Sequence, residues 1–432
     1  MTLLIYNALL VDSRQAPRRG WLLVRDGFIA EIGDGDTPAP IVDSADQKVD
    51  GQGNLLMPGA IDCHVHFREP GMETKADIAG ESRAARAGGV TSYIEMPNTR
   101  PATTTRQSWE DKMERAATRS AVNYAFMMGA TADNLNELRA ADPALMPAVK
   151  VFMGSSTGGM LLADEKPLAA VFAEQGARIV VHAEDQNIID ANAASLPADA
   201  DLNDMRLHTT VRSADACVRA TERALELAAR YGTRLHVAHV TTASECSLFD
   251  PADWPACKQY TAEVSPHHLL WTVDDYVRLG SRIKMNPAVK TAADRAALRE
   301  GLATGRLDIV ATDHAPHLLS DKQGDIFHAA SGAPLVQFSL PVMLDLYDPQ
   351  TVSLRMSDAP AALYGIDRRG LLEPGYHADL ALVERLAEPH TITDSDVISK
   401  CGWTPLAGYA TRHRVVATLV NGGLAPEALR FR

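Results

Sequence analysis

Eight apolar, strand-like runs separated by helix-like segments constrain the fold of this chain more than any other feature. The runs, in chain order, are GAIDCHVH, TSYIEMPN, AVNYAFMMGA, AVKVFMG, RIVVHAED, RLHVAHVT, YTAEVSPHH and DIVATDHAPH. Ala-rich segments such as ETKADIAGESRAARAGG and SADACVRATERALELAARYG lie between them and have the apolar spacing of helices. Alternating strands and helices form parallel sheets, and eight such units predict a closed (β/α)8 barrel, or TIM barrel.

The two ends of the chain have a different sequence pattern, with short strand-like runs and turns, which predicts a second, smaller domain. Residues 1–57 read as short strands and turns, and Asp26-Gly27 has the composition of a two-residue hairpin turn. Strand-like runs return near the C-terminus in GLLEPGYHADLALVE and RVVATLVNGG. Because 432 residues exceed what one hydrophobic core usually supports, we expect a β-sandwich domain from residues 1–57 and 369–432 beside a barrel domain of residues 58–368.

Composition limits the classes of binding partner and the cellular compartment that we expect for this chain. The chain carries 42 basic and 55 acidic residues, a net charge of −13, which argues against nucleic acid as a partner. No apolar run reaches membrane-spanning length, and the N-terminus lacks a basic leader followed by an apolar stretch. We therefore expect no membrane contact and a cytoplasmic location. Five scattered cysteines without a CxxC pair indicate neither a disulfide framework nor a thiolate metal site.

Most of the eight runs carry a polar or ionisable residue at or near the C-terminal end. TIM barrels build their active sites at that end of the strands, so these residues predict an active site unless they gathered there by chance. They are His64, His66, Asn98, Lys150, His182, His239, His267 and Asp313.

The histidines suggest a metal site. His64 and His66 stand two positions apart, so on a regular strand both side chains leave the same face while Cys63 and Val65 point the other way. His182 and His239 each follow a β-branched apolar run, and neutral imidazole is the commonest nitrogen ligand of divalent metals. An exposed histidine pair and single hydrogen-bonded core histidines are the alternatives.

Lys150 and Asp313 extend the same pattern. Lys150 lies inside an apolar strand, where an ammonium group is costly to bury. Either it ends the strand and reaches solvent, or its neutral amine takes up carbon dioxide to form a carbamate that bridges two metals. Asp313 can bind a metal with one oxygen and move a proton with the other, the alternative being a buried structural aspartate.

Together these motifs resemble a known enzyme family. DCHVHFREPG, EMPNTRP, VKVFMGSSTG, VHAED, HVAHVTTAS, TAEVSPHHL, KMNPAVKT and ATDHAPH, in this order, resemble the amidohydrolase superfamily and, within it, the dihydroorotases. The resemblance covers almost the whole chain. It implies a (β/α)8 barrel with two zinc ions, and reversible hydrolysis of L-dihydroorotate to N-carbamoyl-L-aspartate in de novo pyrimidine (UMP) synthesis.

Carried over position by position, the resemblance implies a role for each site residue. His64, His66, Lys150 and Asp313 would bind one Zn2+, and Lys150, His182 and His239 the other, with a hydroxide and the N6-carboxylated Lys150 as bridges. Asp313 would also carry the proton. The substrate contacts would be Arg68, Asn98 and His317 on the carboxylate and Asn286 on the ring. His236, His267, His268 and His314 receive no ligand role.

Three rival functions stay open. A dihydropyrimidinase or hydantoinase shares the metal ligands but acts on substrates without the carboxylate, and allantoinase is a second cyclic amidohydrolase of this kind. The third is a non-catalytic dihydroorotase-like partner of aspartate transcarbamoylase. We expect a small-molecule substrate and a dimer or tetramer, and association with aspartate transcarbamoylase stays open. The loops at residues 154–159 and 318–333 are either connectors or lids over the barrel mouth.

Overall fold

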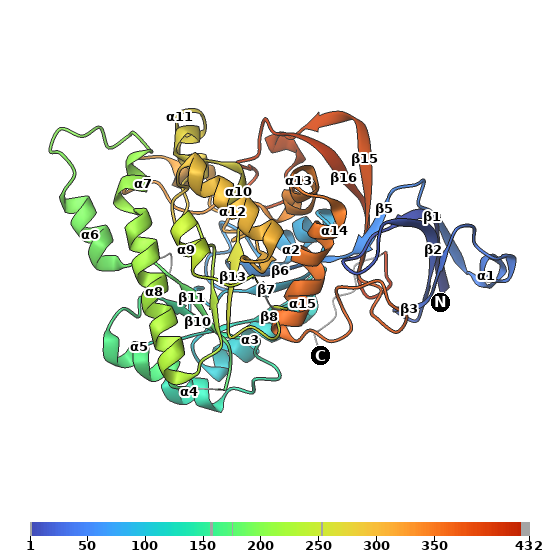
Figure 1. Ribbon diagram of the computed structural model, residues 1–432, viewed down its shortest axis with the longest axis horizontal. Coiled ribbons are helices and arrows are strands. Elements are labelled where there is room, and N and C mark those ends of the chain that lie inside the picture. The colour runs from blue at the N-terminus through green and yellow to red at the C-terminus, as the bar shows by residue number, and fades with distance from the viewer. Residues whose placement is uncertain (1, 156–158, 175, 252–253, 425–432) are drawn as a thin grey trace.

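The computed structural model describes residues 2–155, 159–174, 176–251 and 254–424. A barrel of strands surrounded by helices makes up most of the molecule, and a β sheet containing the N-terminal strands lies at one side (Figure 1). In the described residues, no helix is long and apolar enough to cross a membrane.

The barrel consists of eight parallel strands in chain order. They are β6 (Ala60–Val65), β7 (Val90–Glu95), β8 (Asn123–Phe126) with its continuation β9 (Met128–Gly129), β10 (Val149–Phe152), β11 (Ile179–His182), β12 (Leu235–Val237), β13 (Tyr260–Val264) and β14 (Ile309–Val310). Neighbours pair in the order β6-β7-β8 and β9 to β14. A parallel bridge between Val65 and His314 joins the last strand to the first. Each predicted run overlaps one of these strands, which confirms the predicted (β/α)8 barrel.

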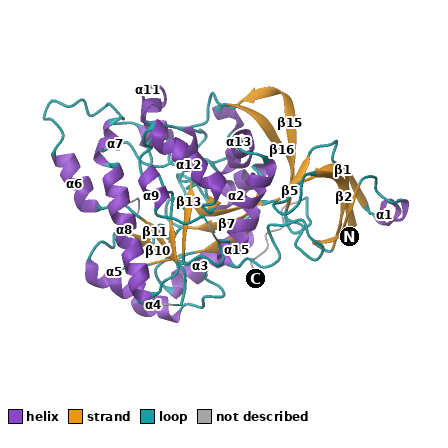
Figure 2. Ribbon diagram, in the orientation of Figure 1, coloured by secondary structure: helices purple, strands orange, loops and turns teal. Residues whose placement is uncertain are grey.

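Helices cover the outside of the barrel (Figure 2). In chain order they are α2 (Ile78–Ala87), α3 (Arg106–Arg119), α4 (Leu135–Ala140), α5 (Glu165–Phe172), α6 (Gln186–Ala194), α7 (Leu207–Val211), α8 (Ala214–Tyr231), α9 (Ala243–Ser247), α10 (Pro266–Leu270), α11 (Tyr276–Leu279), α12 (Ala292–Thr304), α13 (Ser339–Leu346), α14 (Pro349–Ser353) and α15 (Ala359–Tyr364). The longest, α8, starts at the cap Ser213 and ends at Gly232, whose φ of 70° suits the left-handed conformation there. Its buried face, which includes Ala220, Ala224 and Leu227, joins the main apolar core.

Strands from both ends of the chain share one seven-stranded sheet, which confirms the small β domain formed by the two termini. Its members are β1 (Thr2–Leu10), β2 (Arg18–Arg25), β3 (Phe28–Asp34), β4 (Gln47–Asp50), β5 (Leu55–Pro58), β15 (Leu380–Thr391) and β16 (Ala410–Leu419). Leu380 and Leu382 of β15 pack with Leu56 of β5 and Leu10 of β1 in one core. Helix α1 (Ala39–Ser44) lies between β3 and β4. The predicted domain boundaries remain a proposal.

The predicted hairpin turn is present. Arg25 pairs with Phe28 across the antiparallel strands β2 and β3, and Asp26 and Gly27 between them have φ angles of 51° and 86°. Positive φ at both central residues is the requirement of the type I′ turn that Asp-Gly favours.

Strand β6 departs from the regular alternation that the sequence suggests. Its pairing with β7 shifts register between Asp62 and Val65, and the side chain of Asp62 accepts a hydrogen bond from the backbone N–H of His64. Cys63 packs with Ile94 and Met127, whereas Val65 belongs to the separate main core. The expectation that Cys63 and Val65 share one face is therefore wrong, because the register shift interrupts the period of two.

Candidate active site

A cavity of about 30 Å³ opens among the residues at the C-terminal ends of the barrel strands. The lining residues are His64, His66, Arg68, Asn98, Lys150, Phe152, His182, His239, Asn286, Asp313, Ala315, Ser331 and Gly332. Thus all six residues predicted as metal ligands, and three of the four predicted substrate contacts, face the same space. His317 is the exception, and it contacts the cavity residue Arg68 instead.

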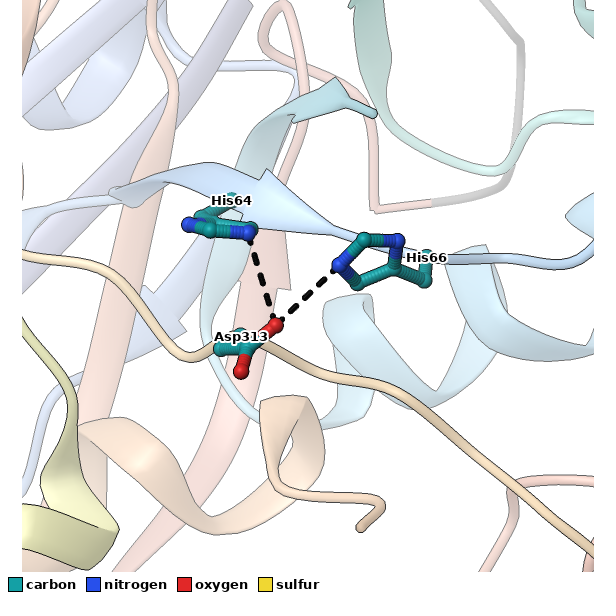
Figure 3. Close-up of side chains that lie close together, drawn as sticks. All are labelled: His64, His66 and Asp313. Atoms are coloured by element: carbon teal, nitrogen blue, oxygen red, sulfur yellow. Dashed lines mark hydrogen bonds and ion pairs between the residues drawn. The ribbon is translucent and has the colours of Figure 1, made fainter. Parts of the chain in front are cut away.

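His64, His66 and Asp313 form a compact group at the point where the first and last strands meet (Figure 3). Oδ1 of Asp313 lies 3.1 Å from Nε2 of His66 and 3.4 Å from Nε2 of His64. Burial opposes ionisation of Asp313, but the charges and hydrogen bonds of His64 and His66 hold its pKa below the usual range. The group thus places two imidazole nitrogens around one carboxylate oxygen.

His182 and His239 form a second group on neighbouring parts of the barrel. Nδ1 of His182 lies 3.0 Å from Nε2 of His239, while Nε2 of His182 lies 2.9 Å from the carboxylate of Glu184. Burial lowers the pKa of both histidines, so both rings are neutral. If Nε2 of His182 donates to Glu184, its Nδ1 presents a lone pair toward His239.

Lys150 lines the same cavity from strand β10. It is fully buried, and its Nζ has no hydrogen-bond partner among the described residues. Burial lowers the pKa of Lys150 to about 8, against the opposing charges of Glu263 and Asp313. An unpaired buried amine of lowered pKa is costly unless a further group satisfies it.

These residues fit a divalent metal centre. Neutral imidazoles and carboxylates are typical ligands of zinc, and the two histidine groups each bring ring nitrogens together within one cavity. The amine of Lys150 is the second indication, because it has no hydrogen-bond partner among the described residues. The ligands of a metal centre in this cavity would lie far apart in the sequence, from His64 near the first barrel strand to Asp313 near the last.

A layer of buried acceptors orients the imidazoles, and the sequence analysis did not assign it. Glu263 accepts from Nδ1 of His64, from Nε2 of His236 at 3.1 Å and from the backbone N–H of His239 at 3.2 Å. Oδ1 of Asn98 lies 2.7 Å from Nδ1 of His66. Such outer partners fix the tautomer and the orientation of metal-binding histidines. The signal was available, since a carboxylate inside the apolar run YTAEV needs a buried partner.

The four histidines without an assigned ligand role lie outside the cavity lining. His236 bonds Glu263 and Thr261, and His314 bonds Glu81 at 2.8 Å. Nε2 of His268 donates to the carbonyl of Pro287. His267 is buried, and neither of its ring nitrogens has a partner among the described residues.

Arg68 brings a buried guanidinium to the cavity. It is 2% exposed, its Nε donates to the carbonyl of Pro316 at 3.0 Å, and one terminal nitrogen lies 3.1 Å from Nε2 of His317. Burial lowers its pKa to about 10, so it stays cationic at neutral pH. Oδ1 of Asn286, also in the lining, has no partner among the described residues. The arrangement offers a buried cation to an anionic ligand.

Three site residues hold strained backbone conformations. Arg68, His239 and Asp313 have φ angles of 69°, 36° and 48°, in the left-handed region that residues other than glycine adopt rarely. Strained backbone of this kind gathers at functional sites where the surrounding structure enforces it. Here it aims three side chains at one cavity.

The segment at residues 318–333 is held together, and tied to Lys284, by the side chain of Lys322. The buried Nζ of Lys322 donates to the carbonyl oxygens of Lys284, Ala330 and Gly332 at 3.0, 2.6 and 2.9 Å. Ser331 and Gly332 from this segment line the cavity. Of the other loop expected at the mouth, residues 154–159, positions 156–158 lie outside the described residues.

Comparisons with known proteins agree on the family. The amidohydrolase family model matches residues 55–424. A dihydroorotase from Methanosarcina acetivorans is 36% identical, over 90% of this chain and 84% of that protein. An allantoinase from Bacillus velezensis is 32% identical, over 96% of this chain and 92% of that protein. The solved structure of the L-hydantoinase (dihydropyrimidinase) from Arthrobacter aurescens is 29% identical with a TM-score of 0.90, over 99% of both chains.

The family match spans the barrel and three of the seven strands of the sheet, β5, β15 and β16. The relatives extend over nearly the whole chain. The cavity, its buried histidines and its carboxylates lie within the matched residues. This chain belongs to the amidohydrolase family, among its cyclic amidohydrolases.

Proposed function

We propose that this chain is a dihydroorotase, which interconverts L-dihydroorotate and N-carbamoyl-L-aspartate in pyrimidine synthesis. The observation that carries the proposal is the buried Arg68, which lines the same cavity as the histidines and Asp313. A buried cation in a cavity that also holds metal-ligand side chains suits a substrate with a carboxylate beside its ring. Relatives at 36 and 37% identity carry the name dihydroorotase.

The metal centre of the proposal uses the residues described above. His64, His66, Lys150 and Asp313 would hold one Zn2+, and Lys150, His182 and His239 the other, with Lys150 carboxylated on its amine. Bound divalent cations would acidify a water molecule and polarise the ring carbonyl. Glu263, Asn98 and Glu184 would keep the imidazoles of His64, His66 and His182 in their ligating tautomers.

The remaining steps belong to side chains of this chain. Arg68, with Asn98 and His317, would bind the substrate carboxylate, and Asn286 would bond the ring with its amide. Asp313 would accept a proton from the attacking water and deliver it to the ring nitrogen as the amide C–N bond breaks. In the synthetic direction the same proton returns to Asp313 while the C–N bond forms.

A second candidate function is hydrolysis of a neutral cyclic amide. It is favoured by the likeness to the allantoinase and to the L-hydantoinase structure. Such a substrate would leave the buried guanidinium of Arg68 without an anionic partner, which is costly. We therefore rank it below the dihydroorotase. Assembly into a dimer or tetramer, and association with aspartate transcarbamoylase, are proposals that rest on the resemblance alone.

One substrate panel tests the proposal. The purified protein, loaded with zinc, is assayed with dihydroorotate beside dihydrouracil, hydantoin and allantoin. We expect dihydroorotate to have the highest kcat/KM by at least about a hundredfold, the discrimination that a site built around a buried polar partner can give. A higher kcat/KM for a neutral ring would overturn the proposal. Metal analysis of the same sample separates an enzyme from a non-catalytic partner, which would lack two zinc ions per chain.

A further inference from the structure

His317 lies between two cationic side chains. Its Nε2 is 3.1 Å from a terminal nitrogen of Arg68, and its Nδ1 is 3.0 Å from Nζ of Lys75. Guanidinium and ammonium groups only donate hydrogen bonds, whereas a neutral imidazole has one N–H and one lone pair. His317 can therefore accept from only one of the two cations, and its own N–H lies beside the other, with the Ser331 carbonyl as a nearby acceptor.

Protonation of the His317 ring does not resolve this conflict between donors. Burial and the charges of Arg68, Lys75 and Lys322 lower the pKa of His317 far below its usual value, and an imidazolium would oppose both neighbours. Two neutral tautomers remain. In one, Nδ1 accepts from Lys75 and the Nε2–H faces Arg68. In the other, Nε2 accepts from Arg68 and the Nδ1–H faces the Lys75 ammonium.

The surroundings favour the tautomer with the proton on Nε2 of His317, the first of the two, only when an anion is present. In the second tautomer the nearest carboxylate oxygen, Oδ2 of Asp321, is 3.9 Å from Nδ1, which is too far for a hydrogen bond. In the first, two donors 3.1 Å apart face each other beside the cavity. A carboxylate oxygen can lie about 2.9 Å from both nitrogens of such a pair and accept from both.

We propose that Lys75 is a positioning residue for anionic substrates: by donating to Nδ1 of His317, it keeps the imidazole proton on Nε2, where that N–H and Arg68 together receive a carboxylate oxygen. The inference rests on the proposed function and deepens it, because an anion in the cavity would accept from both donors. A neutral ring gains nothing from this arrangement. Lys75 is thereby a determinant of substrate class without touching the substrate.

The position of Lys75 suits this role. It lies in the segment between β6 and α2, and its Nζ also pairs with Oδ2 of Asp321 at 3.3 Å. Asp321 accepts in turn from the backbone N–H of Leu318. The pair connects the loop that follows the first strand with the loop that follows the last, and it holds the ammonium against the side of the imidazole away from Arg68.

The test compares Lys75→Met with a matched control, Lys400→Met, on zinc-loaded enzyme. Lys400 contacts the same segment, through the carbonyl of Glu73 and the carboxylate of Asp77 at 3.1 Å, so its removal deletes an equal charge and loosens the same loop. For Lys75→Met we expect KM for dihydroorotate to rise roughly tenfold to a hundredfold, the range for a charge-assisted hydrogen bond. We expect kcat to change by less than about threefold, and kcat/KM for dihydrouracil to stay at the parent value. Lys75→Arg, which keeps a cationic donor, should recover most of the affinity.

A spectroscopic measurement separates positioning from general support. With 15N-labelled histidine and bound N-carbamoyl-L-aspartate, the parent ring of His317 should carry its proton on Nε2, and the Lys75→Met ring should shift toward Nδ1. An unchanged tautomer, an equal rise of KM in Lys400→Met, or an equal loss on dihydrouracil would each overturn the inference. Parent enzyme that fails to turn over dihydroorotate would overturn the proposed function, and this inference with it. Normal parent turnover with an unaffected Lys75→Met would overturn the inference alone.

Discussion

The Glu263 carboxylate accepts a hydrogen bond from the ring Nδ1 of His64, and both side chains are buried. Because Nδ1 donates, the lone pair of His64 is on Nε2, the nitrogen 3.4 Å from Oδ1 of Asp313. The second oxygen of Glu263 holds His236 at 3.1 Å. One carboxylate, contributed by strand β13, thus sets the tautomer of a residue on strand β6.

Replacing Glu263 by Gln should weaken metal binding. The amide keeps one acceptor oxygen but turns an NH2 group toward one of the two imidazole N–H groups, so His64 or His236 must give up its hydrogen bond. Changes to such outer partners typically cost about tenfold to a hundredfold in metal affinity. Competition with a chelator measures the loss. Glu245→Gln is the control, since Glu245 is equally buried but bonds Thr221 and Thr242; equal zinc affinity in the two variants would refute the prediction.

Lys150→Ala should lose both activity and at least one metal. The substitution removes the group that would carry shared negative charge between two cations. Since burial lowers the pKa of Lys150 to about 8, about a tenth of the amine is neutral and nucleophilic at pH 7, as carbamate formation requires. Added acetate or propionate should restore part of the activity, and intact mass analysis of the parent should reveal one added carbon dioxide. A variant with two zinc ions and normal turnover would rule out the bridging carbamate.

Asp313→Asn should keep the fold and most of the metal but lose proton transfer. An amide cannot accept the proton of the attacking water, and general acid-base catalysis is commonly worth roughly a hundredfold or more in rate. The measurement is kcat with zinc content determined on the same sample. A near-normal kcat would assign proton transfer to another residue.

Arg68→Met should separate substrate recognition from metal binding. The change removes the cation that faces the cavity and touches none of the proposed metal ligands, so zinc content should remain near the parent level. Dihydroorotate turnover should fall by about thirtyfold to a thousandfold in kcat/KM, the effect of losing about 2–4 kcal/mol of charged hydrogen bonding. Any activity on neutral cyclic imides should survive. Equal loss of both activities with metal retained would mean that Arg68 supports the loop around Pro316 instead.

Asp62 should make the metal-free protein less stable as the pH rises. Burial raises its folded pKa to about 6 from 3.8, against hydrogen bonds from Thr312 and His64. A raised folded pKa contributes stability that is present below pH 3.8 and is lost as the pH rises through about 6, at most about 3 kcal/mol. The test is to measure the unfolding temperatures of the parent and of Asp62→Asn across this pH window. The unfolding temperature of the variant should rise relative to that of the parent as the pH rises. A difference between the two temperatures that stays constant with pH would contradict the prediction.

Much of this architecture could be predicted from the sequence, for identifiable reasons. Buried barrel strands are continuous apolar runs, so all eight were visible, and the polar residue that ends most of them pointed to the cavity. His317, which was predicted to bind the substrate carboxylate, contacts the cavity residue Arg68 but is not itself part of the cavity lining. The carboxylate of Glu263 inside an apolar run signals a buried partner, but the sequence does not show that this partner is His64 on β6 and His236 on β12. The predicted direction of the Cys63 side chain was wrong, because the amino-acid pattern does not reveal a register shift.

The bridge between Val65 and His314 also has a consequence for how the protein is made. It joins residues about 250 positions apart, and His66 and Asp313 meet beside it. During synthesis the two histidines emerge early, but Asp313 cannot reach them until the eighth strand has left the ribosome and the ring has closed, a slow, non-local event. A nascent or truncated chain that ends before this point therefore lacks Asp313, one of the three residues of this group, and its barrel is open between the first and last strands. Metal binding where the first and last strands meet would therefore follow closure of the barrel, and a bound ion would hold these two strands together.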